Sequence, residues 1–167
     1  MKVEEKAGKL VISDFDEFEA YRIASNIEED GINFYKMIAE RAINPEVRET
    51  LEFLLDEEEK HLEFFSDCLD AIRQEKEDVS KEDDSVTSID FGIFQPYKRL
   101  EDMEKIITNI EKALSLGVVI ENKSIEFYAA CRLHITNEET KEKISNIIEE
   151  EMRHKDKFIQ LMRQAKG

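Results

Sequence analysis

The sequence is poor in glycine, proline and cysteine, and each shortage excludes a class of protein. Five glycines and two prolines among 167 residues are too few for the many tight turns of a β-sandwich or β-barrel. The abundant Glu, Lys, Leu, Ile and Ala favour helices instead. The two cysteines, Cys68 and Cys131, form neither a disulfide framework nor a CxxC pair. We therefore expect a nearly all-α protein in a reducing compartment, with both thiols acting as small core side chains.

Positive charge and long apolar segments are scarce too. The chain carries 24 Lys and Arg against 40 Asp and Glu, and its net charge of −16 repels phosphate backbones and anionic lipids. The first residues contain no apolar run of signal-peptide length. The longest uncharged helical stretch, around residues 114–120, is too short to span a bilayer. These absences predict a cytoplasmic protein that binds neither nucleic acid nor a membrane.

Helical periodicity is the main pattern in the rest of the sequence. The chain length suits one domain spanning residues 1–167. Asp14 and Asp16, each followed by Glu three residues later, are the candidate caps of the first helix. The expected helices cover about residues 15–41, 45–74, 108–133 and 137–164. Residues 75–107 are expected to form a long crossover with a short helical turn near 100–106 and an apolar cluster. That cluster consists of Ile89, Phe91, Phe94 and Tyr97.

The chain contains an internal repeat with an offset of 93 residues. Residues 27–35 (IEEDGINFY) match residues 120–128 (IENKSIEFY), and residues 54–61 (LLDEEEKH) match residues 147–154 (IIEEEMRH). The repeat predicts two helical hairpins of one design, residues 15–74 and 108–165, joined by the crossover. Two such hairpins make a four-helix bundle with pseudo-twofold symmetry.

Charged and polar side chains interrupt the apolar seam of every predicted helix. Spacings of three and four residues place four glutamates and two histidines in the seams: Glu28, Glu58, His61, Glu121, Glu151 and His154. An unpaired carboxylate in a core must take up a proton or bear a large desolvation penalty. No Lys or Arg occupies the seam, so a bound metal is the simplest compensation. Four carboxylates and two imidazoles suit a pair of iron or manganese ions about 3.5–4 Å apart.

A single Glu-x-x-His motif means little in a chain with 40 acidic residues. Here both motifs lie in an apolar seam and both begin 30 residues after a seam glutamate of the preceding helix. Both also occur at the offset of the repeat. The conjunction favours a metal site over the alternative, a bundle whose inner acids are satisfied by water and hydrogen bonds.

The motifs resemble those of the rubrerythrin branch of the ferritin-like superfamily. The matching residues form two sets with the same spacing: Glu28, Tyr35 and Glu58-x-x-His61, then Glu121, Tyr128 and Glu151-x-x-His154. The resemblance covers the two hairpins and implies a ferritin-like bundle that binds two iron ions per chain, cycling between Fe2+ and Fe3+. Manganese or zinc are alternatives in a purified sample.

The resemblance also implies roles for the ligands and an activity. The ligands divide between the ions in this way: Glu28 and His61 for one iron, Glu121 and His154 for the other, Glu58 and Glu151 bridging both. The implied protein is a cytoplasmic homodimer that reacts with hydrogen peroxide or dioxygen in oxidative-stress defence.

Two features depart from rubrerythrins. Rubrerythrins carry a rubredoxin domain with paired CxxC motifs, and this sequence has none, so we expect an external electron-donor protein such as a rubredoxin. They also place a further Glu three residues after the third-helix ligand, where this chain has Ser124. A hydroxyl is a poor substitute for a carboxylate that can move onto iron, which predicts slow peroxide turnover. Gly31 stands at the equivalent place after Glu28, where we expect a Glu to overpack the core.

Other polar residues have weaker signals. Tyr35 and Tyr128 lie one heptad after Glu28 and Glu121, so each phenol is a candidate to hydrogen-bond a ligand carboxylate or to supply an electron. The alternative is a core aromatic with a satisfied hydroxyl. His134 is expected to complement a helix dipole at the surface. The acidic runs 56–59 and 149–151 are expected to be solvated, with one inward member each.

Two other functions remain open at this point. A ferritin-like storage protein would use the same centre to oxidise ferrous ion and pass it to a mineral cavity inside an assembled shell. A structural or interaction module would use Phe91, Phe94 and Tyr97 as its binding patch.

Overall fold

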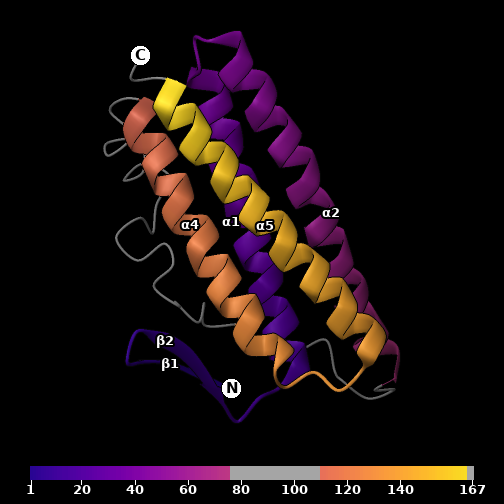
Figure 1. The fold of residues 1–167 in the computed structure, drawn as a ribbon. Coiled ribbons are helices and arrows are strands. Elements are labelled where there is room, and N and C mark those ends of the chain that lie inside the picture. The colour runs from indigo at the N-terminus through magenta and orange to yellow at the C-terminus, as the bar shows by residue number, and fades with distance from the viewer. Residues whose placement is uncertain (76–109, 165–167) are drawn as a thin grey trace.

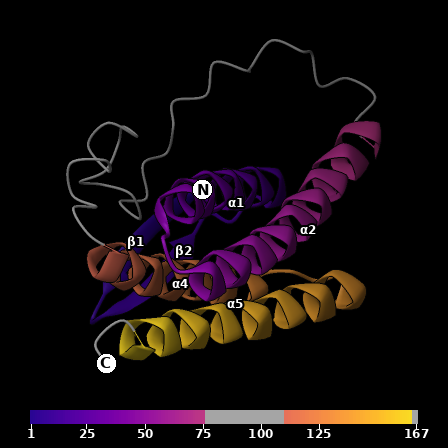
Figure 2. The ribbon, with the colours of Figure 1, turned by 90° about the horizontal axis from the view of Figure 1, so that it is seen from above.

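The computed structural model describes residues 1–75 and 110–164. In this part of the chain, four long helices run alongside one another: α1 (Glu17–Arg41), α2 (Pro45–Glu75), α4 (Ile110–Arg132) and α5 (Glu138–Gln164). Figure 1 shows them as a bundle, and Figure 2 shows the α1/α2 hairpin packed over the α4/α5 hairpin. Most of the crossover expected over 75–107 lies outside the described residues, together with the helical turn near 100–106 and the apolar cluster of Phe91, Phe94 and Tyr97.

Side-chain caps determine where three of the helices begin. Asp16 accepts a hydrogen bond from the Glu19 amide at 2.8 Å, so α1 begins at Glu17 rather than at Phe15. Asp14, the other candidate cap, lies in the preceding turn with a φ of 51°. Asn44 accepts a bond from the Glu46 amide at 2.9 Å in front of α2, and Asn137 accepts one from the Thr140 amide at 3.0 Å in front of α5.

A β-hairpin precedes the bundle, and the expectation of a nearly all-α chain omitted it. Strands β1 (Lys2–Lys6) and β2 (Lys9–Ser13) pair antiparallel, with Lys2 opposite Ser13. Ala7 and Gly8 form the turn with φ values of 53° and 74°, as a two-residue turn with both φ angles positive requires. Ile12 is buried, and β2 packs against α4 near the end of the bundle (Figure 1).

The core consists of two hydrophobic clusters, each built from all four helices. One contains residues 34–39, 47–54, 113–120 and 158–161 as its buried apolar members, and the other contains those of 20–27, 65–69, 127–131 and 144–147. Every one of the six predicted seam residues falls between the two clusters in its own helix. The bundle therefore has a polar middle level enclosed by apolar packing on both sides.

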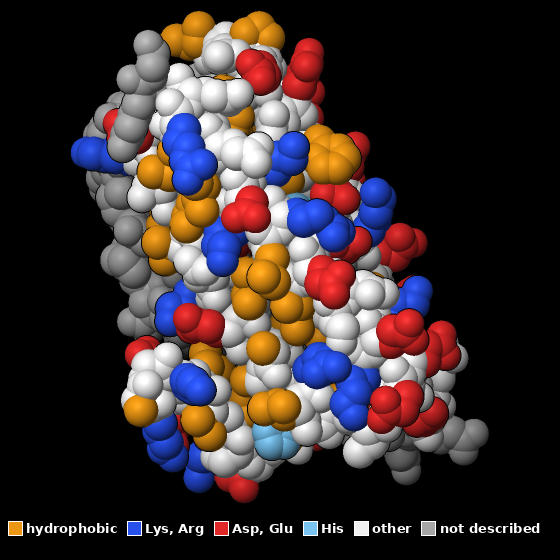
Figure 3. All heavy atoms as spheres, in the orientation of Figure 1, with side chains coloured by type: hydrophobic (Ala, Val, Ile, Leu, Met, Phe, Trp, Pro, Cys, Tyr) orange, Lys and Arg blue, Asp and Glu red, His pale blue; other side chains and the backbone are white. Residues whose placement is uncertain are grey.

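The surface carries most of the charge. On the face drawn in Figure 3, acidic side chains gather along the edge formed by α2 and α5, and apolar side chains line the groove between α4 and α5. None of the helices in residues 1–75 and 110–164 is both long enough and apolar enough to cross a membrane. Cys68 is half-buried and Cys131 buried, and burial raises the pKa of their thiols to about 11 and about 12. Both cysteines are therefore protonated at neutral pH.

Candidate metal centre

The polar middle level brings together all six predicted ligands. They come from all four helices, and each side chain is at most 3 % exposed: Glu28, Glu58, His61, Glu121, Glu151 and His154. Helical periodicity explains their direction, because each continues the apolar stripe of its helix at a spacing of three or four residues. At these six positions the middle of the bundle therefore buries ionisable side chains where apolar ones would otherwise lie.

The six side chains form two overlapping groups that share two carboxylates. One group is Glu28, Glu58, His61 and Glu151; the other is Glu58, Glu121, Glu151 and His154. Within each group, one nitrogen or oxygen atom from each residue lies within 4.8 Å of the others. Four donors at such spacing can surround one cation, so the level has the donor set for two cations with Glu58 and Glu151 common to both.

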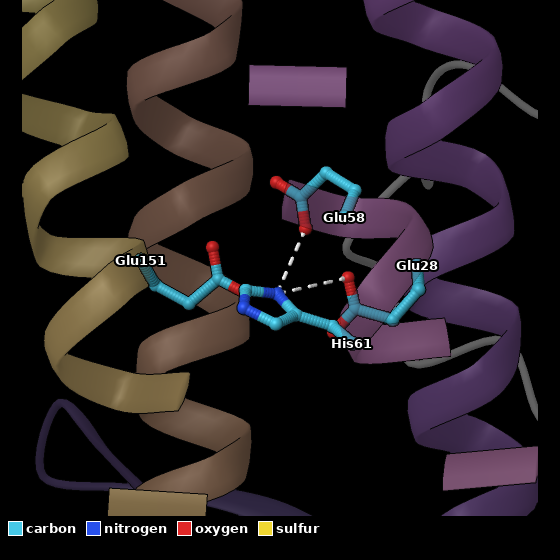
Figure 4. Close-up of side chains that lie close together, drawn as sticks. All are labelled: Glu28, Glu58, His61 and Glu151. Atoms are coloured by element: carbon cyan, nitrogen blue, oxygen red, sulfur yellow. Dashed lines mark hydrogen bonds and ion pairs between the residues drawn. The ribbon is translucent and has the colours of Figure 1, made fainter. Parts of the chain in front are cut away.

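The shared carboxylates face both histidines. Nδ1 of His61 lies 3.2 Å from Oε2 of Glu58 and 3.2 Å from Oε1 of Glu151. Nδ1 of His154 lies 3.0 Å from Oε1 of Glu58 and 3.2 Å from Oε2 of Glu151. Each shared carboxylate therefore presents one oxygen to each half of the site. Figure 4 shows Glu28, Glu58 and Glu151 converging on the His61 ring.

The two remaining glutamates lie at the outer ends of the cluster. An oxygen of Glu28 is 3.8 Å from Nδ1 of His61, and an oxygen of Glu121 is 4.0 Å from Nδ1 of His154. Each of these two carboxylates belongs to one group only, on opposite halves of the site, and they are called the terminal pair below.

Glu151 tests whether a cation fits. Both of its oxygens are buried, and neither accepts a hydrogen bond from any described residue, although each lies at ion-pair distance from an imidazole. A buried carboxylate without hydrogen bonds is costly, by about 1–3 kcal/mol or more for a charged group. The residues present fit a bound metal pair, because metal ions held by this carboxylate would replace the imidazolium charges that face it in the metal-free protein.

The carboxyl groups divide into two kinds by pKa. Burial, with the negative charges of Glu58 and Glu151, raises the pKa of Glu28 and of Glu121 well above the ordinary value. Burial also acts to raise the pKa of Glu58 and Glu151, but their interactions with the two histidines outweigh it and hold the pKa of both below the ordinary value. Without metal, burial thus favours the protonated form of the terminal pair, and the histidines favour the ionised form of the shared pair.

The histidines complete this balance. Burial acts to lower the pKa of both rings, but the contacts with Glu151 and Glu58 outweigh it and raise the pKa of His61 to about 12 and that of His154 to about 10. Two imidazolium ions therefore compensate two carboxylates in the metal-free protein. Metal held by these residues would compete with protons for the same nitrogen and oxygen atoms, so its binding would be favoured by higher pH.

The two tyrosines donate hydrogen bonds to candidate ligand carboxylates across the bundle. Tyr35 on α1 donates its hydroxyl hydrogen to Glu121 on α4, and Tyr128 on α4 donates to Glu28 on α1. Burial and the neighbouring carboxylate raise the pKa of both phenols, so both remain donors. Each tyrosine thus serves the glutamate of the opposite hairpin, and each ring also packs in a hydrophobic cluster.

Sequence reasoning missed Glu57 and Glu150. Only one member of each acidic run was expected to point inward, and that expectation is wrong. Oε2 of Glu57 lies 3.0 Å from Nε2 of His154, and Oε2 of Glu150 lies 2.8 Å from Nε2 of His61. Their side chains are 21 % and 33 % exposed, so both lie at the rim of the site. The repeat contained a signal, since the two residues are separated by its offset.

Three other residues lie outside the cluster. Ser124 is buried one turn after Glu121 and donates its hydroxyl hydrogen to the Ile120 carbonyl at 3.2 Å. At Gly31 a Cβ atom would meet nothing within 4 Å, so there is room for the first side-chain atom, and the overpacking expected of a whole Glu side chain stays a prediction. The His134 ring stacks on Phe15, with centroids 5.0 Å apart, beyond the end of α4.

The fold and the site together define a class of protein. A four-helix bundle with one Glu on each of two helices and Glu-x-x-His on each of the other two has the architecture of the ferritin-like carboxylate proteins. The Rubrerythrin family model matches residues 19–162, and the chain belongs to the rubrerythrin family. The resemblance seen in the sequence is thereby confirmed.

A solved structure has the same fold. It is that of a Thermotoga maritima protein described as a ferritin-like diiron-carboxylate protein, with 22 % sequence identity and a TM-score of 0.65. The match covers 90 % of this chain and 97 % of that one. It confirms the expected all-α, ferritin-like four-helix bundle. No curated protein matches this chain.

Proposed function

We propose that this chain is a non-haem di-iron oxidoreductase that reduces hydrogen peroxide or dioxygen as part of oxidative-stress defence. The observation that carries the proposal is Glu151. Its carboxylate is buried without a hydrogen bond, yet each oxygen faces the Nδ1 atom of a different histidine. This carboxylate needs positive charge beside it, and the two overlapping donor groups together with membership of the rubrerythrin family favour a pair of iron ions in that role.

The ligand roles follow the two overlapping groups. Glu28 and His61 would hold one iron, Glu121 and His154 would hold the other, and Glu58 and Glu151 would be shared by both. This division is supported by the two groups, which have only Glu58 and Glu151 in common. Manganese and zinc accept the same oxygen and nitrogen donors, so a purified sample can contain either.

The bound iron pair supplies electrons and Lewis acidity. The chain supplies the surroundings: the two hydrophobic clusters limit the access of water, and Tyr35 and Tyr128 hold the terminal carboxylates. Reduction of hydrogen peroxide to water consumes protons as well as electrons. The phenols keep their protons at neutral pH, so they can orient Glu121 and Glu28 throughout turnover.

The partners are part of the proposal. Electrons come from an external carrier such as a rubredoxin, and the protein acts as a homodimer in the cytoplasm. These assignments are carried from the family resemblance. They predict that a reduced rubredoxin supports catalytic turnover, whereas the isolated protein consumes oxidant only until its own ferrous ions are spent.

Anaerobic iron reconstitution tests the proposal. Protein loaded with Fe2+ should contain about two iron ions per chain, and addition of hydrogen peroxide or of dioxygen should produce a near-ultraviolet ferric absorption with consumption of oxidant. A Glu58→Ala/Glu151→Ala double variant is the control. Wild-type protein that binds no iron, or bound iron that neither oxidant oxidises, would overturn the proposal.

Size-exclusion chromatography of the same sample separates the storage alternative. A homodimer supports the oxidoreductase, because a ferritin-like mineral cavity requires a very large assembled shell. A shell that accumulates many iron ions per chain would replace the proposed function with iron storage.

A further inference from the structure

Each histidine of the centre is held at both ring nitrogens by two consecutive glutamates of the opposite hairpin. Glu57 and Glu58 on α2 contact Nε2 and Nδ1 of His154, each at 3.0 Å. Glu150 and Glu151 on α5 contact Nε2 and Nδ1 of His61, at 2.8 and 3.2 Å. In both pairs the second glutamate belongs to the buried cluster and the first lies at its rim.

We propose that Glu57 and Glu150 are positioning residues for the two histidine ligands. Each accepts the Nε2–H of a histidine from the other hairpin and so keeps the Nδ1 lone pair directed at a metal ion. This inference rests on the proposed metal centre and deepens it, because it names the residues that determine which ring nitrogen binds.

The chemistry of imidazole supports this role. A neutral ring carries one proton, and only the nitrogen without it can bind a metal. An ionised carboxylate is an acceptor only, so a carboxylate at Nε2 keeps the proton on that nitrogen. The Nδ1 atoms already face the shared carboxylates of Glu58 and Glu151, where the two groups of donors overlap.

The location of Glu57 and Glu150 explains why they would orient the histidines rather than bind metal themselves. Both contact the Nε2 edge of a ring, which is the edge that faces away from the shared carboxylates. Glu150 is held further by Arg153, whose Nη2 lies 3.3 Å from its other oxygen. Partial exposure leaves the oxygens that the histidines do not contact open to water.

Zinc binding and histidine NMR test the inference. Zn2+ alone is titrated into the metal-free full-length chain, and the Zn2+-loaded protein, labelled with 15N in its histidines, is examined by long-range proton–nitrogen NMR. In the wild type, His61 and His154 should show a metal-bound Nδ1 and a protonated Nε2 that exchanges slowly with water. Glu57→Ala and Glu150→Ala should each weaken Zn2+ binding about 10- to 100-fold. The variant should also lose the slow exchange at one histidine: His154 for Glu57→Ala and His61 for Glu150→Ala.

Matched control variants remove one negative charge from the residue that precedes Glu57 or Glu150. Asp56→Ala and Glu149→Ala alter exposed acids next to the proposed residues and should leave affinity and exchange unchanged. Glu57→Gln and Glu150→Gln retain an acceptor oxygen and helix-forming shape, so they should show a smaller loss and decide the matter if an alanine variant does not fold.

The possible outcomes separate the inference from the proposed function. Wild-type protein that binds no Zn2+ contradicts the metal centre and, with it, the positioning role. Wild-type binding of two ions with unchanged affinity and exchange in Glu57→Ala and Glu150→Ala overturns the positioning role alone. An equal loss in Asp56→Ala or Glu149→Ala would assign the effect to overall charge and would also overturn it.

Discussion

Gly117 on α4 lies directly against the ring of Phe158 on α5. A Cβ atom at position 117 would be 2.7 Å from Cε1 of that ring, closer than real Cβ atoms approach a neighbour. Phe158 is fully buried, and its ring centroid is 5.3 Å from that of Tyr35, which in turn bonds Glu121. Glycine at 117 therefore permits the close packing of α4 on α5 next to the candidate metal centre.

Gly117→Ala should lower the free energy of unfolding by about 1–2 kcal/mol. Overpacking costs about 1–3 kcal/mol and exceeds the gain of up to about 1 kcal/mol from better helix propensity. Gly31→Ala is the control, because a Cβ there meets nothing within 4 Å, and it should stabilise by up to about 1 kcal/mol. Urea denaturation measures both, and equal signs for the two variants would contradict the packing at Gly117.

The number of metal ions that a variant binds should depend on whether the replaced residue belongs to one donor group or to both. Glu58→Ala and Glu151→Ala should each lose both ions, because each residue belongs to both groups, whereas Glu28→Ala and Glu121→Ala should each retain one. Metal analysis after anaerobic reconstitution with Fe2+ gives the count. Two ions per chain in the Glu58→Ala/Glu151→Ala double variant would refute the assignment of the site.

The metal-free protein should lose stability as pH rises above about 6.5. Folded His61 and His154 keep their protons up to about pH 12 and 10, whereas in the unfolded chain their pKa returns to 6.5. The folded state then binds more protons in this window, so stability falls with pH, by on the order of 1 kcal/mol per pH unit for each ring. Glu28 and Glu121, whose pKa values are raised, change stability in the same direction above about pH 4.5.

Below about pH 4.5, the stability of the metal-free protein should rise with pH instead of falling. The pKa values of Glu58 and Glu151 are lowered by folding, so their contribution is lost as pH falls below about 4.5. Metal-free protein should therefore be most stable near pH 4.5, lose stability above it as the Glu28 and Glu121 contribution declines, and lose it more steeply above about pH 6.5 when the histidines contribute as well. Metal affinity should rise with pH because binding releases protons, and loading should therefore stabilise the protein most above pH 7. Thermal melting of loaded and chelated protein across pH checks this; identical melting curves at neutral pH would contradict it.

Ser124→Glu should accelerate peroxide turnover. The substitution places a carboxylate one helical turn after Glu121, at a buried position whose hydroxyl now bonds only within its own helix among the described residues. Turnover with an artificial reductant is compared for the wild type, Ser124→Glu and the repeat-related variant Gly31→Glu. Equal rates for the wild type and Ser124→Glu would show that residue 124 does not reach the metals.

The seam residues could be predicted because helical periodicity and the repeat constrain them together. Glu58 and His61 continue an apolar series on one helix, and Glu151 and His154 repeat it 93 residues later, so direction and depth follow from spacing. The helix bounds were predicted to within about two residues wherever the structure describes them, since Asn44, Pro45 and Asn137 are strong capping signals.

Contacts between the hairpins could not be predicted in the same way. Tyr35 lies seven residues, about 10 Å, along the helix from Glu28, too far for a hydrogen bond. The antiparallel approach of α4 brings Glu121 to it instead. Glu57 belongs by periodicity to the flank of α2, and only the position of α5 turns that flank into a binding surface for His154.

The N-terminal hairpin was missed for a different reason. Its alternation of polar and apolar residues is short, and only Ile12 is fully buried, so the pattern over residues 2–13 is weak. Two strands alone are marginal in water, and packing of β2 on α4 supplies the stability that local sequence does not.

The polar middle level also determines the axial register of the two hairpins. Sliding one hairpin by a single helical turn, about 5.4 Å, would move Glu58 away from the histidines and against apolar side chains of the other hairpin. Uniform apolar seams would tolerate such a slip, whereas an ionised carboxylate buried in an apolar cluster does not. The side chains that hold the candidate metal centre thus select one alignment of four long helices from several of similar hydrophobic content. A variant with an apolar middle level would lose that selection even if it became more stable.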